Sequence, residues 1–240
     1  MAKEAAVTDG GTDHGKRLHE IAVEIAALAQ NGLNYANKGT GSLDASRPGP
    51  GALGDRYEIA RYRRLQEISA EVLAMVAGQE PSHFHRQIVS EIGHATPKVD
   101  VRGAIFDDDG RVLLVQEAKD RRWTLPGGWA DALDAPTEAI IREVAEEAGL
   151  ATRVRKLAAV HDGFRSNGHP VAPFHIYKLL FLMERLDDAG PTAGLDEETI
   201  DVGFFGLDAL PVLSTFRTNE AQVHRLYAHH QDLTLPPDVD

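Results

Sequence analysis

The sequence predicts an α/β (α+β) fold in which a mixed domain of strands and helices follows a small N-terminal helical domain. Two observations predict this. Up to about residue 97, apolar residues recur every three or four positions, as in amphipathic helices. From Val99 onward, short apolar runs between turn residues alternate with helical patterns. We therefore expect residues 16–97 to form the helical domain and residues 98–240 to form the second domain, which carries the chemistry described below.

Three amphipathic helices are predicted in the N-terminal domain. Their apolar residues recur at spacings of three and four: Leu18, Ile21, Ile25 and Leu28, then Leu65, Ile68, Val72 and Val76, then Phe84, Ile88 and Ile92. Gly32 follows the first pattern and is interpreted as a helix stop. The apolar stripes must be buried, and either the second domain or a second copy of the chain would satisfy this requirement.

Two segments of the N-terminal region have too few apolar residues for a packed structure. Residues 1–15 are polar and contain several glycines, so we expect a disordered start. Residues 38–54 are rich in Gly, Ser and Pro, and their burial could not offset the loss of chain entropy. We interpret them as a flexible insertion.

The second domain begins with two predicted strands, Val99–Phe106 and Arg111–Glu117, which Asp107-Asp108-Asp109-Gly110 would join as a β-hairpin. A short strand at Trp123–Leu125 leads into Pro126-Gly127-Gly128. The remaining predicted elements are a helix at Pro136–Ala148, strands at Val154–Val160, Ile176–Glu184 and Asp201–Phe205, and a helix at Asn219–His229. No internal repeat is present.

Composition excludes several classes of protein. Apolar residues make up 42% and charged residues 26% of the 240 residues, as in a folded globular protein. The 25 basic and 37 acidic residues give a formal net charge of −12, which argues against broad electrostatic binding of nucleic acid or anionic membrane. The chain has no cysteine, so disulfides, zinc-thiolate sites and thiol nucleophiles are excluded.

The sequence predicts neither a membrane segment nor a secretory leader. No apolar run approaches the roughly 18 residues of a membrane span, and the opening eleven residues contain no apolar leader core. We therefore expect a cytoplasmic protein.

A cluster of carboxylates carries the densest chemistry. On the helix predicted at Pro136–Ala148, Glu143 lies three residues before Glu146 and four before Glu147, so the three side chains share neighbouring faces. Like charges at this spacing repel, and a hard cation such as Mg²⁺, which prefers oxygen ligands, would reverse the repulsion. A solvated acidic helix face is the alternative, and the spacing alone leaves both open.

The segment around this helix resembles the Nudix box. That motif has a Gly, five residues, a Glu, seven residues, Arg-Glu, an aliphatic residue, any residue, Glu-Glu, any residue, Gly and an aliphatic residue. The matching residues are Gly128, Arg142, Glu143, Val144, Glu146, Glu147, Gly149 and Leu150. The early Glu is Asp134 here, which is the one departure. So long a spaced motif in a strand–loop–helix context is specific.

The resemblance implies an α/β/α sandwich with a mixed sheet and a metal-dependent hydrolase. It places Glu143, Glu146 and Glu147 at the family's metal-ligand and base positions and the Gly127 carbonyl at a further ligand position. Arg142 would orient the glutamates by charge-assisted hydrogen bonds. The implied cofactor is Mg²⁺ or Mn²⁺, which would activate a water and neutralise charge that develops on the phosphates.

Asp134 has two interpretations. It stands just before Ala135-Pro136-Thr137, where Asp is a favoured helix N-cap and Pro fits the first turn. An outer role at the metal site is the alternative, although Asp is one methylene shorter than the family's Glu. We favour the cap.

The resemblance extends beyond the box to a Nudix subgroup with a helical N-terminal domain, which includes CDP-choline pyrophosphatase and ADP-ribose pyrophosphatase-like enzymes. It is carried by Ala95–Phe106, Val112–Glu117, Trp123–Asp131, His175–Lys178 and Phe204-Phe205. It covers the chain from about Lys16 to His230, without the insertion. It implies a homodimer and a nucleoside diphosphate substrate linked to another moiety, cleaved to a nucleoside monophosphate and a phosphorylated moiety.

Substrate contacts outside the box are less specific. Arg102, His175 and Lys178 lie on predicted strands and are candidates, although polar strand residues are commonly cross-strand partners. Trp129 and Phe174 are candidates for stacking on a base, with core packing as the alternative.

Two other groups are interpreted as structural. His161, His169 and His175 match no compact zinc motif and are expected in loops or on the surface. The basic group Arg56, Arg61, Arg63 and Arg64, with Tyr57 and Tyr62, is expected to form a solvated helix face that pairs with Glu58 and Glu67.

Two alternative functions remain open. One is a Nudix-like regulator that only senses a nucleotide, which the retention of all three glutamates disfavours. The other is a Nudix hydrolase that acts on RNA ends or nucleoside triphosphates, which the net charge of −12 disfavours for RNA. No motif identifies the base or the linked moiety.

Overall fold

The computed structural model of the chain describes residues 13–39, 54–166, 172–193 and 198–240. Helix α1 begins at Asp13, so residues 13–15 are not part of a disordered start. Residues 38, 39 and 54, expected in the flexible insertion, end α1 and begin α2. The rest of those two predicted segments, and His169, lie outside the described residues. The chain divides into two compact units: Met1–Pro97 with Gly168–His175, and Lys98–Asn167 with Ile176–Asp240.

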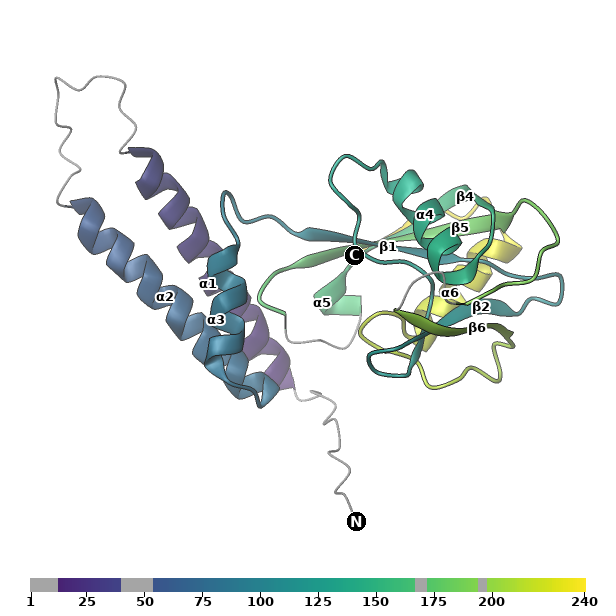
Figure 1. The fold of residues 1–240 in the computed structure, drawn as a ribbon, viewed down its shortest axis with the longest axis horizontal. Coiled ribbons are helices and arrows are strands. Elements are labelled where there is room, and N and C mark those ends of the chain that lie inside the picture. The colour runs from purple at the N-terminus through teal and green to yellow at the C-terminus, as the bar shows by residue number, and fades with distance from the viewer. Residues whose placement is uncertain (1–12, 40–53, 167–171, 194–197) are drawn as a thin grey trace, which may run out of the picture. The chain divides into compact units, whose positions relative to one another are not determined.

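The first unit is helical, with α1 (Asp13–Gly39), α2 (Gly54–Ala77) and α3 (Pro81–Ser90). Figure 1 shows α1 and α2 side by side, and α3 packs against α2. Their shared core is made mostly of small residues: Ala22, Ala26, Ala29, Ala70, Leu73 and Ala74. The Ser69 hydroxyl donates to the Ala22 carbonyl at 2.7 Å. Small side chains and this bond allow the two helix backbones to lie close together.

The sequence predicted that Gly32 stops the first helix, and this prediction is wrong. Helix α1 continues to Gly39. A β-carbon at Gly32 would collide with the ring of Tyr62 on α2. This glycine is therefore explained by close packing against an aromatic ring, not by helix termination. The third predicted helix is also shorter than its pattern, since it ends at Ser90 and leaves Ile92 88% exposed.

Part of the predicted basic face is confirmed. Arg64 pairs with Glu67 at 2.9 Å and also with Glu71 at 3.0 Å, and all three side chains are about half exposed. The side chain of Arg56 lies outside the described residues.

The second unit contains two sheets. The larger has the strand order β1-β5-β4-β7, formed by Lys98–Ala104, Ile176–Arg185, Thr152–Asp162 and Asp238–Val239. The smaller has the order β3-β2-β6, formed by Trp123–Thr124, Val112–Glu117 and Thr199–Phe205. Strand β5 runs parallel to β1 and antiparallel to β4, so the larger sheet is mixed, as predicted.

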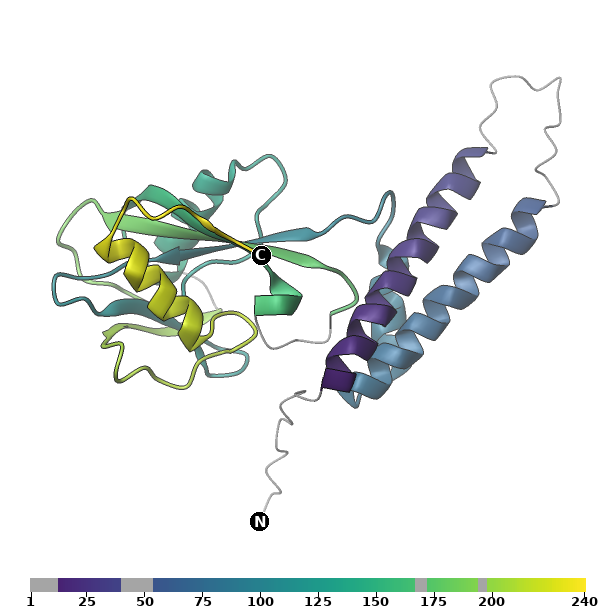
Figure 2. The same ribbon diagram turned by 180° about the vertical axis from the view of Figure 1, so that it is seen from behind.

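Helices α4 (Pro136–Ala148) and α6 (Glu220–Gln231) pack on two separate apolar cores, and a single helical turn, α5, spans Gly163–Ser166. On β5, Phe181 joins the core with α4 whereas Leu180 and Leu182 join the core with α6. Because successive strand residues face opposite sides of a sheet, the two helices cover opposite faces. Figure 2 shows α6 on its face, and the predicted sandwich is confirmed.

The predicted β-hairpin between the first two strands is confirmed only next to its turn, where the Leu113 amide donates to the Ile105 carbonyl at 2.9 Å. The turn is present, and Phe106 bridges Val112, but β1 then pairs with β5 whereas β2 pairs with β3 and β6. The sequence pattern identified both strands and the turn but could not identify the nonlocal partners, which lie some 70 or more positions along the chain. Among the described residues, no helix is both long and apolar enough to cross a lipid bilayer.

Candidate active site

A glycine loop lies between strand β1 and helix α4. The Gly103 amide donates to the Pro126 carbonyl at 2.9 Å and the Val101 amide donates to the Gly128 carbonyl at 2.8 Å, so the loop follows β1 and these bonds skip the Gly127 carbonyl. Gly127 has φ +135°, and a β-carbon there would collide with the Val101 carbonyl. A β-carbon on Gly128 would lie 2.8 Å from a Glu143 carboxylate oxygen. Gly127 therefore requires glycine, whereas a side chain at Gly128 would displace the Glu143 carboxylate.

Helix α4 has the bounds predicted from the sequence but not the predicted cap. Its N-cap is Ala135, whose amide is bound by the Glu138 carboxylate at 3.1 Å. Asp134 instead pairs with Arg142 at 3.3 Å. The interpretation of Asp134 as the N-cap is thus wrong, because a charged guanidinium one and a half turns into the helix competes for its carboxylate and forms the stronger bond.

Glu147 is the most deeply buried glutamate of the helix, at 6% exposure. The Gly127 amide donates to its carboxylate at 2.7 Å, which connects the helix to the glycine loop. Burial raises the pKa of Glu147 to about 8, and the nearby positive charge of Arg102 opposes that rise. Such a carboxylate gains from any further cation placed beside it.

Glu143 and Glu146 lie nearer the surface and share one cation. Arg142 Nη1 donates to Glu143 at 3.0 Å and to Glu146 at 3.1 Å, while Nη2 contacts Asp131 and Asp134, each at 3.3 Å. Burial also raises the pKa of Glu143, and the charge of Arg142 opposes this most strongly. One guanidinium thus joins two helix glutamates to two aspartates of the preceding loop.

The donors at this site are of the chemical type that Mg²⁺ or Mn²⁺ binds. Carboxylate oxygens of Glu143, Glu146 and Glu147 come from adjacent faces of α4 beside the main chain of the glycine loop. Within the described part of the chain, no three His, Asp or Glu side chains already converge on one point. Because Arg142 neutralises two of the three glutamates, binding of a metal would require these side chains to adjust.

Arg102 and Lys178, predicted as substrate contacts, have buried side chains. Arg102 is 4% exposed and forms two hydrogen bonds with Asp100, at 2.8 and 3.0 Å, and one with the Leu125 carbonyl at 3.1 Å. Lys178 is also 4% exposed, and its Nζ donates to the Phe216 carbonyl at 2.5 Å and the Arg217 carbonyl at 2.7 Å. Burial lowers the pKa of Lys178 to about 7. The charged groups of Arg102 and Lys178 therefore bind groups of the protein itself.

The other predicted substrate contacts are distributed over both units. Trp129 follows the glycine loop in the second unit and is 48% exposed. His175 and Phe174 belong to the first unit and are partly buried. His161 lies opposite Lys178 in the β4–β5 register, and its Nδ1 lies 3.2 Å from the Gln222 amide nitrogen. His161 was expected in a loop or on the surface, but it lies on β4 and is partly buried. Burial lowers its pKa.

Sequence reasoning missed two features of this region. Asp100, which neutralises Arg102, could have been found because residues two apart on a strand share one face. The turn at residues 131–134 gave no signal. The Asp134 amide donates to the Asp131 carbonyl at 3.2 Å, and Leu133 has φ +80° with its side chain fully exposed. A left-handed conformation at a residue other than glycine costs roughly 1–2 kcal/mol.

Comparisons with known proteins agree on one family. The model of the NUDIX domain matches residues 96–227. A Bacillus subtilis protein named "Putative ADP-ribose pyrophosphatase YjhB" is 34% identical over 208 residues, which cover 87% of this chain and 89% of that protein. The crystal structure of an ADP-ribose pyrophosphatase from Streptococcus suis is 33% identical with a TM-score of 0.54, and covers 60% of this chain and 100% of that one. The crystal structure of a UDP-X diphosphatase is 26% identical with a TM-score of 0.55, and covers 94% and 99% of the two chains.

Proposed function

The chain belongs to the Nudix hydrolase family and is a pyrophosphohydrolase, and on this premise we propose that its substrate is ADP-ribose or a closely similar nucleoside diphosphate. Water would attack one phosphorus, and the bridging P–O bond would break to give AMP and ribose 5-phosphate. The observation that carries the reaction type is the row of three glutamates on α4, two of which, Glu147 and Glu143, lie against the Gly127-Gly128 loop. The choice of ADP-ribose rests on the relatives with that name.

Glu143, Glu146, Glu147 and the Gly127 carbonyl would hold Mg²⁺ or Mn²⁺. When bound, such an ion supplies a more acidic water and neutralises charge on the diphosphate. The chain's own groups prepare this site: the Gly127 amide fixes the Glu147 carboxylate, and Arg142 fixes Glu143 and Glu146. One of these carboxylates would accept the proton of the attacking water.

Arg102 and Lys178 act in this proposal as positioning residues. The charge of Arg102 opposes the rise that burial causes in the pKa values of Glu147 and Glu143, so it favours the ionised form of both carboxylates. Lys178 holds the main chain at Phe216 and Arg217, and Arg217 pairs with Glu117 at 3.1 Å. Neither cation need touch the substrate.

The proposal is tested by product analysis with ADP-ribose, CDP-choline, a UDP-sugar, ATP and a short 5′-triphosphate RNA, each with Mg²⁺, with Mn²⁺ and with a chelator. We expect metal-dependent release of AMP from ADP-ribose at the highest kcat/KM. Preferred cleavage of CDP-choline would replace the substrate but keep the reaction. Preferred cleavage of ATP or RNA would overturn the substrate class, and binding without turnover would favour a nucleotide sensor.

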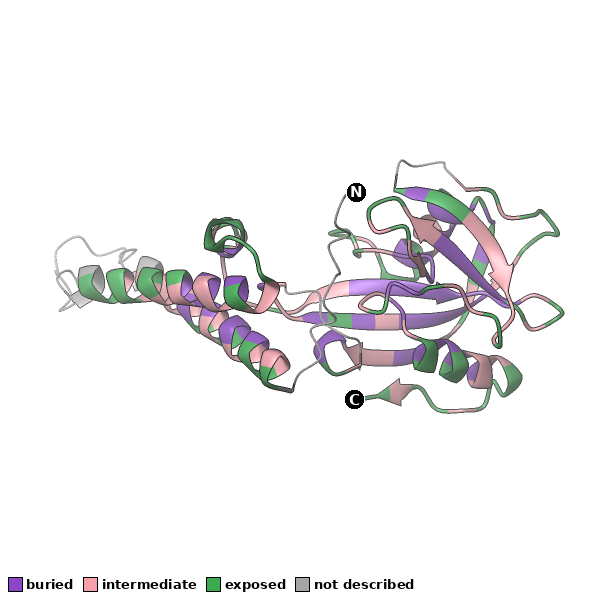
Figure 3. Ribbon diagram, turned by 90° about the horizontal axis from the view of Figure 1, so that it is seen from below, coloured by how far each residue is buried: buried purple, intermediate pink, exposed green. Residues whose placement is uncertain are grey.

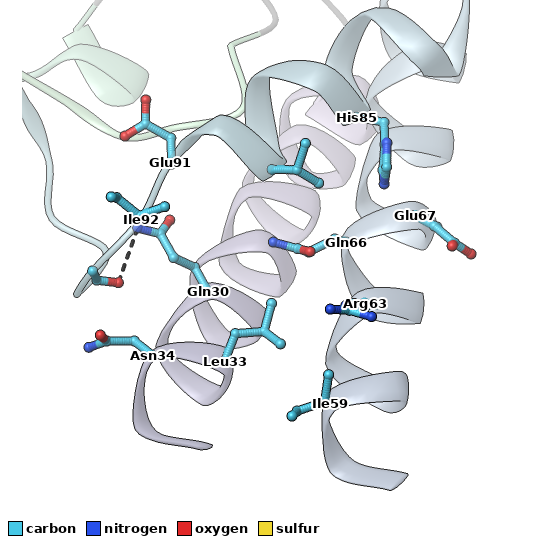
Figure 4. Close-up of a pocket in the computed structure, with 12 residues that line it drawn as sticks. Gln30, Leu33, Asn34, Ile59, Arg63, Gln66, Glu67, His85, Glu91 and Ile92 are labelled. Atoms are coloured by element: carbon cyan, nitrogen blue, oxygen red, sulfur yellow. Dashed lines mark hydrogen bonds between the residues drawn. The ribbon is translucent and has the colours of Figure 1, made fainter. Parts of the chain in front are cut away.

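We further propose that the chain is a homodimer formed through its helical unit. A groove of about 770 Å³ lies among α1, α2 and the end of α3, and Figure 4 shows Leu33 of α1 and Ile59 of α2 beside it. Ile92 and Val89 also line the groove, and both side chains are largely exposed. The same unit therefore offers a groove of mixed polar and apolar lining together with protruding apolar side chains, which a self-complementary contact with a second copy would cover. In Figure 3, α1 and α2 show exposed residues along the side away from their shared core.

Light scattering after size-exclusion chromatography tests this assembly. We expect a dimer for the wild type and a monomer for Ile92→Asp. Val212→Asp, which alters an exposed apolar residue of the second unit, is the matched control and should remain dimeric. A monomeric wild type at micromolar concentration would contradict the proposal.

A further inference from the structure

The turn that leads into α4 contains an apolar residue in an unfavourable backbone conformation. The Asp134 amide donates to the Asp131 carbonyl, so Ala132 and Leu133 are the central residues of a β-turn. The positive φ of Leu133, +80°, is that of the third position of a type II turn, which favours glycine. The leucine side chain gains nothing in return within this chain, because it is fully exposed. Strained residues of this kind concentrate where a chain contacts a ligand.

The turn is held in place from both ends. Arg142 Nη2 contacts Asp131 and Asp134, and Nη1 of the same guanidinium contacts Glu143 and Glu146. This arrangement ties the turn to the glutamate face of α4, and Leu133, between the two aspartates, stays exposed beside that face. Its position is therefore fixed relative to the groups that carry the reaction.

The charges around the turn decide which part of a substrate could meet Leu133. Four carboxylates surround one guanidinium, so the local charge is negative. Phosphate oxygens are disfavoured there unless a metal lies between. An uncharged and largely apolar face, such as that of a nucleoside base, is compatible with both the leucine and the local charge. Trp129, 48% exposed and four residues earlier on the same loop, adds a second apolar surface.

We propose that Leu133 is a specificity-determining residue that contacts the nucleoside half of the substrate beside the diphosphate site. This inference rests on the proposed function and adds to it a residue at a position that the box motif leaves unspecified, with the part of the substrate that it recognises. The strained turn is then maintained because it presents an apolar side chain next to the carboxylates.

The test compares three substitutions with a matched control. Leu133→Gly removes the side chain and relieves the strain, Leu133→Asn tolerates the left-handed conformation but is polar, and Leu133→Met keeps an apolar side chain. Arg121 has the other positive φ among the described non-glycine residues, +55°, so Arg121→Gly relieves similar strain elsewhere. For each protein we would measure the melting temperature, KM and kcat for ADP-ribose, and the calorimetric Kd for AMP and for ribose 5-phosphate with Mg²⁺ present.

We expect Leu133→Gly and Leu133→Asn to keep or raise the melting temperature while KM for ADP-ribose and Kd for AMP rise roughly tenfold, the usual effect of losing a small apolar contact. The Kd for ribose 5-phosphate, and all constants of Leu133→Met and Arg121→Gly, should stay near those of the wild type. Unchanged Kd for AMP in Leu133→Gly, or no AMP binding to the wild type, would overturn the inference. AMP binding that depends on Leu133 without any turnover of ADP-ribose would instead overturn only the proposed function.

Discussion

The two units of the molecule differ in whether they bury charged side chains. Among the described residues, every buried carboxylate, lysine and arginine side chain lies in the second unit: Asp100, Arg102, Glu147 and Lys178. The first unit buries apolar residues and a few neutral groups, such as Ser69 and His19, and burial lowers the pKa of His19. Its ion pairs, such as Arg64 with Glu67, are exposed.

This difference separates a unit that performs chemistry from a unit that packs. Burying a charge is expensive unless a partner is fixed beside it, and the second unit fixes such partners around the glutamates of α4. The first unit carries no such cost, and it exposes several large apolar side chains, including Tyr35, Met75 and Ile92. The second unit also exposes large apolar side chains, such as Leu133 and Val212, so the two units differ in their buried charges and not in their exposed apolar residues.

The largest effect on this comparison should come from Asp100→Asn. It leaves the buried guanidinium of Arg102 without its countercharge, which should lower the free energy of unfolding by about 3–5 kcal/mol. Tryptophan fluorescence in urea measures this in the second unit alone, since Trp123 and Trp129 are the chain's two tryptophans. The double variant Asp100→Asn/Arg102→Met should recover most of the loss. A loss below about 1 kcal/mol in the single variant would show that the pair is hydrated.

The next largest effect should come from Glu147→Gln. We expect kcat/KM to fall by at least about a hundredfold. Mutating a residue that only hydrogen-bonds to a metal ligand typically lowers activity by about 10–100-fold, and loss of the ligand itself should cost more. The melting temperature should hardly change, because glutamine can accept the same bond from the Gly127 amide and burial already disfavours the charged form. Glu138→Gln on the first turn of α4 is the matched control and should keep its activity. Near-normal activity of Glu147→Gln would refute the metal-ligand assignment.

A pH-dependent effect should come from Lys178→Met. The folded pKa of Lys178, about 7, lies below its ordinary value of 10.5, so the unfolded chain takes up the proton first as pH falls. The wild type should therefore lose stability relative to Lys178→Met by about 1.4 kcal/mol per pH unit between pH 10 and pH 7, and by no more below pH 7. Urea unfolding at four pH values checks this. A difference independent of pH would mean that Lys178 remains charged.

The smallest effect should come from Arg64→Gln in the first unit. The ion pairs of Arg64 with Glu67 and Glu71 are exposed and screened by salt, so we expect no measurable change in helix content or melting temperature. Circular dichroism at low and high ionic strength is the measurement. A clear loss of helix would remove the contrast between the two units.

Local patterns in the sequence predicted much of this fold. The apolar spacing and flanking Pro136 and Gly149 gave the bounds of α4, because these signals act within a few residues. The pairing of β1 with β2 was predicted incorrectly beyond the turn because strand partners are chosen by nonlocal packing. The role of Gly32 was predicted incorrectly because this glycine packs against the Tyr62 ring of another helix. At the site, the box pattern identified the glutamates, but spacing could not show that Arg102 is buried against Asp100 or that Asp134 pairs with Arg142.

The short strand β7 also decides how the larger sheet ends. It pairs with β4 at Ala159 and Val160, and Asp238 is held there by Arg225, at 2.5 and 2.6 Å, and by the buried His229 at 3.1 Å. An uncovered strand edge is a template for pairing with another chain. The Arg225–Asp238 pair thus holds a cover over Ala159 and Val160 of β4. We expect its loss to appear first as slow self-association during storage or expression, while freshly prepared protein still turns over substrate.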